Sequence, residues 1–307
     1  MSIKKILFMG TPDYATCIFK ELLASSYEVL ALFTQEDKKV GRKQVLSAPH
    51  IKQYCLDENI DIPIYQPKKL RNNDEAYEQI KALAPGIIIV AAYGQILPKN
   101  ILDLAPCMNL HASLLPKYRG ASPIQEAILN DDSYTGVTAM FMEEGLDTGD
   151  ILGLQYLKLE DKMEVAEVFD KLSIIAAKLT LDTLDNFENI KPKKQNNALS
   201  SLCKKIKKEH GLVSFKNAKK LYQTYKAYSY WPGVFLESGL KIKEISLINE
   251  TSINKEGEIL GFDKNAVIIG CEEGSLKINI LQAPSKKEVN AADYIRGQRL
   301  SIGEVLK

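Results

Sequence analysis

The feature that most constrains the fold is an unbroken apolar run within GIIIVAAYG, residues 86–94. Its apolar residues do not alternate with polar ones, which is typical of a strand covered on both faces in a parallel sheet. Such strands are usually linked by helical crossovers. The run therefore predicts an α/β domain with a buried central strand.

The N-terminal residues fit the same architecture. An apolar run at 4–9 and another at 28–34 flank a helical pattern with apolar residues on one face, at Ala15, Ile18, Phe19, Leu22 and Leu23. Strand, helix and strand in this order predict a right-handed βαβ unit. The turn after the first strand is Gly-Thr-Pro-Asp, which lacks the G-x-G-x-x-G fingerprint, so we do not expect NAD.

The remaining elements of this region follow from their apolar patterns. We expect strands at 62–65, 107–113 and 136–142, and helices near 50–58, 73–83, 97–104 and 161–187. Residues 35–50, QEDKKVGRKQVLSAPH, are polar and basic and predict a long loop, and residues 143–152 predict another.

The chain is long for one core, since 307 residues suit two domains. We expect a catalytic domain over 1–188, a basic linker over 189–210 that contains seven lysines, and a C-terminal domain over 211–307. A helix is predicted at 217–228, then short strands at 233–237, 240–249, 257–262, 265–271 and 274–282. The expected fold is thus a Rossmann-like, mostly parallel sheet flanked by helices, followed by a small OB-like β-barrel.

The charge is divided unevenly between the two parts. Residues 189–307 carry 21 Lys and Arg against 12 Asp and Glu, although the net charge of the whole chain is only +1. A basic C-terminal third indicates either an anionic partner or a solvated lysine-rich surface, and the charge alone leaves both open.

Cysteine usage and hydropathy exclude several classes of protein. The five cysteines are scattered and form no C-x-x-C pair, which favours reduced thiols in the cytoplasm and argues against structural zinc. The apolar stretch at the N-terminus is too short for a signal peptide, and no segment is long enough to span a membrane. We expect neither a metal nor a membrane partner.

Two polar side chains lie on one face of the strand predicted at 107–113. Asn109 and His111 project the same way because strand side chains alternate, and Leu110 faces the other way. Ligands of open α/β sheets bind at the carboxyl ends of the strands. An amide that stabilises an oxyanion beside an imidazole that moves a proton suits acyl transfer. A hydrogen-bonded pair without chemistry is the alternative.

Asp147 is the acidic residue that we expect to orient His111. It lies in the glycine-flanked loop GLDTGD, residues 145–150, where glycines permit close backbone approach. The alternative is an aspartate that only caps its own turn.

These motifs together resemble a known family. NLHASLLPKYRGASPIQ followed by GLDTGDIL resembles the 10-formyltetrahydrofolate-dependent formyltransferases. The landmarks FMGTPDYA, VAAYGQILP, SPIQEAIL, AYSYWPGVF and RGQRLSIGE extend the resemblance over nearly the whole chain, to the branch that acts on methionyl-tRNA.

The resemblance implies an activity and a set of site residues. It implies transfer of the formyl group from 10-formyltetrahydrofolate to the free amino group of methionyl-initiator-tRNA, giving N-formylmethionyl-tRNA for translation initiation. Asn109, His111 and Asp147 would be catalytic. The folate co-substrate would lie against Ser113, Leu114, Leu115, Pro116, Ala92 and Tyr93.

The resemblance also implies residues for the tRNA. In that branch the loop after the second strand approaches the acceptor end, and here it carries Lys38, Lys39, Arg42 and Lys43; a disordered basic loop is the alternative. The linker lysines Lys204, Lys205, Lys207 and Lys208 would contact the tRNA backbone. Trp231 is expected to be a core anchor of the second domain, with a base-stacking platform as the alternative. The chain is expected to be a monomer.

Three other functions remain open from the sequence. An amino-sugar nucleotide formyltransferase shares the catalytic trio and the folate donor. A formyltetrahydrofolate hydrolase would release formate, and an inactive formyltransferase core would only bind RNA. The basic loop, the lysine-rich linker and the basic C-terminal third favour the tRNA substrate.

Overall fold

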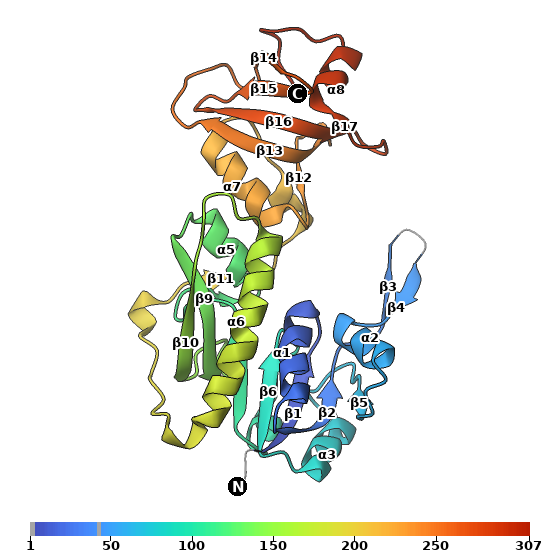
Figure 1. Cartoon of the computed structure of the whole chain (residues 1–307), viewed down its shortest axis with the longest axis vertical. Helices are drawn as coiled ribbons and strands as arrows, with labels where there is room; N and C mark the ends of the chain where they lie inside the picture. The colour runs from blue at the N-terminus through green and yellow to red at the C-terminus, as the bar shows by residue number, and fades with distance from the viewer. Residues whose placement is uncertain (1–3, 42–43) are drawn as a thin grey trace. The chain divides into compact units, whose positions relative to one another are not determined.

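A computed structural model describes residues 4–41 and 44–307, which divide into two compact units (Figure 1). The first unit runs to Pro123 and also contains Tyr134–Lys158 and Phe169–Cys203. The second contains Ile124–Ser133, Leu159–Val168 and Lys204–Lys307. Two short segments of the N-terminal half thus belong to the second unit, and the sequence-based boundaries at 188 and 210 stay predictions.

The first unit is built on a seven-stranded, mostly parallel sheet. Its strand order is β10-β9-β7-β6-β1-β2-β5, and the pairs from β7 to β5 are parallel while β9 and β10 are antiparallel. The strands are β1 (Lys5–Gly10), β2 (Glu28–Phe33), β5 (Ile64–Tyr65), β6 (Ile87–Ala91), β7 (Cys107–His111), β9 (Tyr134–Phe141) and β10 (Ile151–Lys158). The predicted sheet is confirmed.

Strand β6 occupies the middle of this sheet, between β7 and β1. All five of its residues are buried, as an apolar run without alternation predicts. Its neighbours bring their carboxyl ends to one edge, since Gly10 pairs with Ala91 and Val90 pairs with Asn109. The predicted site residues on β7 therefore lie next to the end of β6.

Helices flank the sheet where the apolar periodicity predicted them. They are α1 (Asp13–Ala24), α2 (His50–Asp57), α3 (Asp74–Leu83), the short α4 (Lys99–Leu102) and α6 (Val165–Asp185). Helix α6 buries Leu172, Ala176 and Leu179, which lie on its predicted apolar face. The β1-α1-β2 unit has parallel strands, so the predicted βαβ unit is confirmed.

Two segments predicted as loops contain strands. Within 35–50 the chain forms a small hairpin of β3 (Lys38–Val40) and β4 (Val45–Ser47), whose turn contains Gly41 with φ of +68°. Its strands have no buried face, so their sequence does not alternate between apolar and polar residues and gave no strand prediction. The loop predicted at 143–152 ends at Ile151, where the edge strand β10 begins.

The second unit contains an antiparallel sheet, as predicted. Its strands pair in the order β12-β13-β16-β15-β14, with β17 also on β16. They are β12 (Val234–Phe235), β13 (Lys241–Asn249), β14 (Ile259–Asp263), β15 (Ala266–Gly270), β16 (Ser275–Gln282) and β17 (Val289–Asn290); the helices are α5 (Pro123–Leu129), α7 (Ala218–Tyr228) and α8 (Ala291–Gly297). The sequence predicted α7 and missed α5 and α8.

Trp231 is not the core anchor that the sequence suggested. Its side chain is 50 % exposed, between α7 and β12, so that prediction is wrong. The core of this unit is mostly aliphatic, with Leu221, Ile259, Leu276 and Ile278 almost fully buried, and its buried aromatic residues are Phe215 and Tyr225.

The five cysteines form no disulfide with one another. Burial raises the pKa of the Cys55 thiol to about 11, and the pKa values of Cys107 and Cys271 to about 12. These thiols stay protonated at neutral pH and are poor nucleophiles and metal ligands. No cluster of metal-binding side chains occurs among residues 4–41 and 44–307, and none of the helices described there is long and apolar enough to cross a membrane.

The burial of β6 leads to a stability prediction. Ile89→Ala removes a fully buried side chain from the central strand and should lower the free energy of unfolding by about 2–5 kcal/mol. Ile174→Ala, on a 65 % exposed position of α6, is the matched control and should change it by less than about 0.5 kcal/mol. Urea unfolding followed by circular dichroism measures both. Equal midpoints for the two variants would contradict a buried central strand.

Candidate active site

The carboxyl end of β7 presents two of the predicted catalytic residues. Asn109 pairs with Met140 of β9, and His111 pairs with Thr138 two residues along, so both side chains project from one face. Asn109 is half-buried and His111 is buried. The amide and the imidazole therefore lie close together at the edge where open α/β sheets bind ligands.

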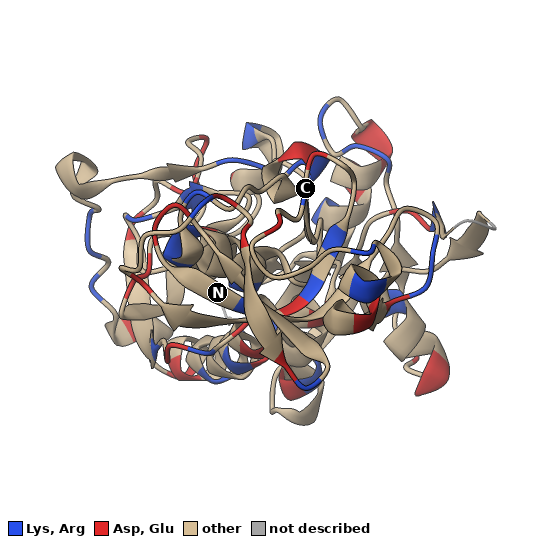
Figure 2. Cartoon of the chain, turned by 90° about the horizontal axis from the view of Figure 1, so that it is seen from above, with Lys and Arg blue, Asp and Glu red and all other residues tan. Residues whose placement is uncertain are grey.

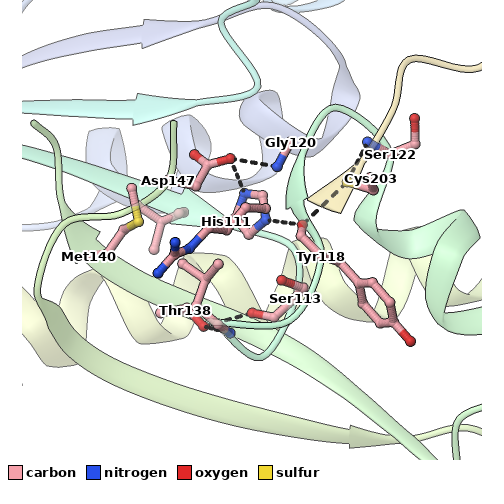
Figure 3. Close-up of polar contacts among 12 residues, drawn as sticks. His111, Ser113, Tyr118, Gly120, Ser122, Thr138, Met140, Asp147 and Cys203 are labelled. Carbon is pink, nitrogen blue, oxygen red and sulfur yellow. Dashed lines mark hydrogen bonds and ion pairs between the residues drawn. The ribbon is translucent and has the colours of Figure 1, made fainter. Parts of the chain in front are cut away.

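The imidazole of His111 lies between two oxygen atoms (Figure 3). Its Nε2 lies 2.9 Å from the carbonyl oxygen of Tyr118. Its Nδ1 lies 3.7 Å from Oδ2 of Asp147. The structure thus brings together the histidine of NLHAS and the carboxylate of GLDTGD, which are 36 positions apart in the sequence.

These contacts fix the tautomer of His111. A carbonyl oxygen only accepts hydrogen bonds, so Nε2 carries a hydrogen and donates it to Tyr118. Nδ1 then faces Asp147 with a lone pair in the neutral ring and with a hydrogen in the imidazolium. The distance of 3.7 Å exceeds a hydrogen bond but lies within ion-pair range. A proton on Nδ1 changes this contact from repulsion to attraction.

The loop that carries Asp147 is a tight connection between β9 and β10. Asp147 adopts φ of +52°, a left-handed conformation that aspartate tolerates better than most residues. A Cβ added to Gly149 would lie 1.9 Å from the carbonyl oxygen of Phe141, so only glycine fits there. The backbone N–H of Gly120 donates a 2.8 Å hydrogen bond to Oδ2 of Asp147. That oxygen is therefore held by Gly120 on one side and faces His111 on the other.

The sequence analysis did not predict the residues that hold the backbone of the Asp147 loop. The side-chain amide of Gln195 donates to the carbonyl oxygens of Asp147, at 2.9 Å, and of Gly149, at 2.8 Å. Its Oε1 accepts from Nε and Nη2 of Arg119, at 3.0 and 2.7 Å. Arg119 also donates to Oδ1 of Asn197 at 2.8 Å and is only 6 % exposed. A buried guanidinium thus orients the glutamine that holds the Asp147 loop.

A short two-residue ladder attaches this supporting segment to the turn that follows His111. Strand β11 (Leu202–Cys203) pairs in parallel with β8 (Arg119–Gly120). Gly120 has φ of +123°, and a Cβ there would lie 2.2 Å from the carbonyl oxygen of Cys203. The polar composition of residues 189–210 predicted only a linker. A strand of two residues has no periodic pattern that would reveal it in the sequence.

The residues predicted to contact folate after His111 form a compact turn. Ser113 is fully buried, and its Oγ donates a 2.6 Å hydrogen bond to the carbonyl oxygen of Lys117. Leu115 is buried, and its N–H donates to Oγ1 of Thr138. Leu114 and Pro116 are half-buried. Only these last two side chains present a sizeable surface, and all four folate assignments stay predictions.

The other two folate candidates follow β6 directly. Ala92 is exposed and has φ of +45°. Tyr93 is buried, its hydroxyl has no hydrogen-bond partner within the described residues, and burial raises its pKa well above the usual range. Side chains from the loops that follow β1 and β2 fix the backbone here, since Thr11 and Gln35 both donate to the carbonyl oxygen of Tyr93.

The residues predicted to bind tRNA are on the surface wherever the structure describes them. Lys38 and Lys39 are exposed on β3, whereas Arg42 and Lys43 lie outside the described residues. Lys204, Lys205, Lys207 and Lys208 are exposed, and Lys207 lies 3.6 Å from Glu209. Exposure suits contacts with a polyanion, and the assignments stay predictions.

The arrangement around His111 suits acyl transfer to a nitrogen. An amide donor stands beside an imidazole whose one nitrogen is fixed by Tyr118 and whose other nitrogen can hold a proton against Asp147. Such a set can stabilise an oxyanion and move one proton.

Comparison with protein families gives two matches along the chain. The model of the formyl transferase domain matches residues 4–183, and that of the formyl transferase C-terminal domain matches residues 205–299. The first match covers the β7 edge and the Asp147 loop. The second covers most of the second unit.

Curated relatives match over nearly their full length. A methionyl-tRNA formyltransferase of Nitratiruptor sp. is 53 % identical over 98 % of this chain and 99 % of its own. One of Campylobacter lari is 52 % identical over 99 % of this chain and all of its own.

Solved structures with a similar fold are more distant in sequence. An N-formyltransferase from Helicobacter canadensis, in complex with folinic acid and dTDP-3-aminofucose, has a TM-score of 0.67 at 20 % identity and covers 90 % of this chain and 98 % of that one. HypX from Aquifex aeolicus, in complex with tetrahydrofolic acid, has a TM-score of 0.64 at 18 % identity, over 94 % of this chain and 46 % of that one. At these identities the likeness establishes the fold alone.

The support beneath Asp147 leads to a prediction. Gln195→Ala removes both hydrogen bonds to the loop and an acceptor of Arg119, so the loop loses its position beside His111. The rate of the predicted formyl transfer should fall by up to about 100-fold, with KM little changed. Gln53→Ala, an exposed glutamine on α2, is the control. Steady-state kinetics measures both, and a Gln195→Ala enzyme as fast as the control would contradict the role.

Proposed function

This chain belongs to the formyl transferase family, and we propose that it transfers the formyl group of 10-formyltetrahydrofolate to the α-amino group of methionine esterified to initiator tRNA. The product is N-formylmethionyl-tRNA, which serves translation initiation. The observation that carries the proposal is identity of 50 % or more along the entire length of relatives that act on methionyl-tRNA. The alignments span both halves of the chain.

The main alternative substrate, an amino-sugar nucleotide, has weaker support. The structural neighbour bound to dTDP-3-aminofucose is only 20 % identical to this chain. Its fold is shared, but its substrate cannot be inferred from the fold. The lysine-rich stretch at 204–208 favours a polyanion over a single nucleotide sugar.

The first chemical step is attack of the amine on the formyl carbon. The α-amine titrates near neutrality in peptides, at about pH 8, so an appreciable neutral fraction exists and the enzyme has to position it rather than activate it strongly. As the N–C bond forms, the carbonyl π pair moves to the oxygen. The amide N–H of Asn109 donates to that oxyanion, on the face that Asn109 shares with His111.

The second step moves one proton and releases the folate. The amine nitrogen becomes positively charged on attack and has to lose a proton before the intermediate collapses. Nδ1 of His111 is the nitrogen that can take it, because Nε2 is committed to Tyr118. Asp147 stabilises the imidazolium so formed. The proton then passes to N10 of the folate as the C–N10 bond breaks.

The tRNA is held by basic side chains in both units. Lys38, Lys39, Arg42 and Lys43 approach the acceptor end, and the lysines at 204–208 neutralise backbone phosphates. The enzyme acts as a monomer in the cytoplasm, where free thiols stay reduced and charged tRNA is available.

One assay tests the function directly. The protein is supplied with 10-formyltetrahydrofolate labelled in the formyl group, together with methionyl-initiator-tRNA or an amino-sugar nucleotide. The label should appear on methionyl-tRNA. Label on the amino sugar, its release as formate, or its retention on the folate would each refute the proposal.

The catalytic roles predict the effect of two substitutions. Asn109→Ala should lower kcat by about 10²–10³-fold, since it removes an oxyanion donor, and His111→Ala by about 10²–10⁴-fold, since it removes the proton carrier. His50→Ala, an exposed histidine at the start of α2, is the matched control and should keep the parental rate. Single-turnover formylation measures all three. Either site variant, if folded and as fast as His50→Ala, excludes its assigned role.

The tRNA lysines predict a different kinetic signature. Replacing Lys204, Lys205, Lys207 and Lys208 by Ala should raise KM for methionyl-tRNA and leave folate binding unchanged. The slope of log affinity against log salt should become shallower by about 3 if all four lysines contact phosphates. The control removes the same charge elsewhere, at the exposed Lys68, Lys69, Lys286 and Lys287. A salt dependence equal in both variants would contradict the assignment.

A further inference from the structure

Two neighbouring aromatic side chains lie on the surface of the second unit, just after α7. Tyr230 is 89 % exposed and Trp231 is 50 % exposed, and Trp231 is the only tryptophan of the chain. Aromatic side chains contribute most of their stabilisation when buried, so two exposed neighbours add little to folding. Their exposure indicates a surface that serves binding.

The turn that carries these side chains is held firmly. The N–H of Gly233 donates to the carbonyl oxygen of Tyr228 at 2.9 Å and closes the turn around them. On the other side, Gly211 packs so closely that an added Cβ would lie 2.1 Å from the carbonyl oxygen of Gly233. The N–H of Val213 donates to the carbonyl oxygen of Phe235. The aromatic pair is therefore displayed by an ordered backbone.

The same contacts bring a basic segment beside the aromatic pair. Gly211 ends the 3₁₀ turn Lys208–Gly211, and the exposed Lys204, Lys205, Lys207 and Lys208 lie directly before it or in it. Acidic and basic residues are interspersed over most of the chain (Figure 2), but residues 204–236 contain eight lysines and a single acid, Glu209. Among these lysines Lys226 is buried and Lys219 pairs with Asp131 and Glu250. The positive charge near the exposed rings therefore comes mainly from the exposed lysines at 204–208.

We propose that Tyr230 and Trp231 form a stacking platform for an unpaired base of the substrate tRNA, with the adjoining lysines on its phosphates. Aromatic rings beside a basic groove are the usual means of holding unpaired nucleotides, because every base offers a π-face. The inference rests on the proposed function, which supplies the tRNA. It adds a contact of a different physical kind, one that is insensitive to salt.

The stacked base belongs to the body of the tRNA and not to its 3′-terminal strand. That strand carries the reacting amine and has to end at His111 and Asp147, which lie in the first unit. The aromatic pair lies in the second unit, which has its own apolar core. We therefore assign the stacked base to a different unpaired position of the same RNA.

Affinity measurements on the full chain test the platform. Tyr230→Ala and Trp231→Ala should each weaken binding of tRNA by about 5- to 100-fold, the usual loss per stacked base. Trp231→Phe retains a ring and should restore most of the affinity. Tyr156→Ala, at a 64 % exposed tyrosine of the first unit, is the matched control and should bind as the parent does. The salt slope should be the same in every variant, because stacking releases no counterions.

The single tryptophan also reports on the contact directly. Its emission, excited where tyrosine does not absorb, should be quenched at saturating intact tRNA and equally by tRNA lacking its 3′-terminal strand. A minihelix of the acceptor stem with that strand should leave the emission unchanged. Unchanged emission with intact tRNA, quenching by the minihelix, or parental affinity of both alanine variants would each overturn the proposal.

A parallel control separates this proposal from the enzymatic one. Formylation of methionyl-tRNA by the parental chain is measured with the same preparations. If the parental chain formylates methionyl-tRNA but its tryptophan emission does not change when tRNA is added, only the proposed stacking platform is refuted. If it does not formylate, the proposed function fails. Thermal melting of the two alanine variants at the parental temperature shows that they are folded.

Discussion

Burial of β6 on both faces is the constraint on which the rest of the first unit depends. A strand with no solvated face can only be accommodated between parallel neighbours that are covered by helices, so the chain has to return over the sheet after each strand. The loops at the carboxyl edge are the part of this arrangement that remains free to carry chemistry. Asn109 and His111 stand at that edge because β7 is the immediate neighbour of β6.

The chemistry at that edge depends on a few backbone groups as much as on side chains. The Tyr118 carbonyl fixes one nitrogen of His111, and the Gly120 N–H fixes one oxygen of Asp147. Behind them, Arg119 holds Gln195, which holds the loop of Asp147. The three consecutive residues 118–120 thus position both His111 and Asp147. Positioning of this kind allows a modest set of groups to accelerate transfer to an amine that is already a competent nucleophile.

We propose that the second unit holds a large polyanion. Its core is a compact antiparallel sheet. Lys204, Lys205, Lys207 and Lys208 lie before or in the 3₁₀ turn Lys208–Gly211, and Gly211 packs against Gly233, two residues after the exposed Trp231. In this proposal, electrostatic attraction brings the RNA to the surface from a distance but does not set its register. Stacking acts only at contact, so it would fix where the RNA lies. Lysines and aromatic rings together would then both attract the RNA and orient it.

Periodicity in the sequence determined the parallel sheet, its flanking helices and the antiparallel sheet that follows. Alternation on β7 also placed Asn109 and His111 on one face, because that property is local to five residues. Elements without a periodic pattern were not predicted. The hairpin β3-β4 has no buried face, and β8 and β11 are only two residues long. The surface position of Trp231 was also not predicted, because the exposure of one side chain depends on which other side chains fill the core.

Tertiary structure alone decided the details on which the chemistry depends. The 3.7 Å approach of Asp147 to His111, the tautomer imposed by Tyr118 and the support from Gln195 join segments that are distant along the chain. No local pattern encodes such contacts, because they arise only once the sheet has folded and its loops have closed on one another. The sequence by itself determined which groups would meet at the sheet edge; the folded chain determined how they face each other.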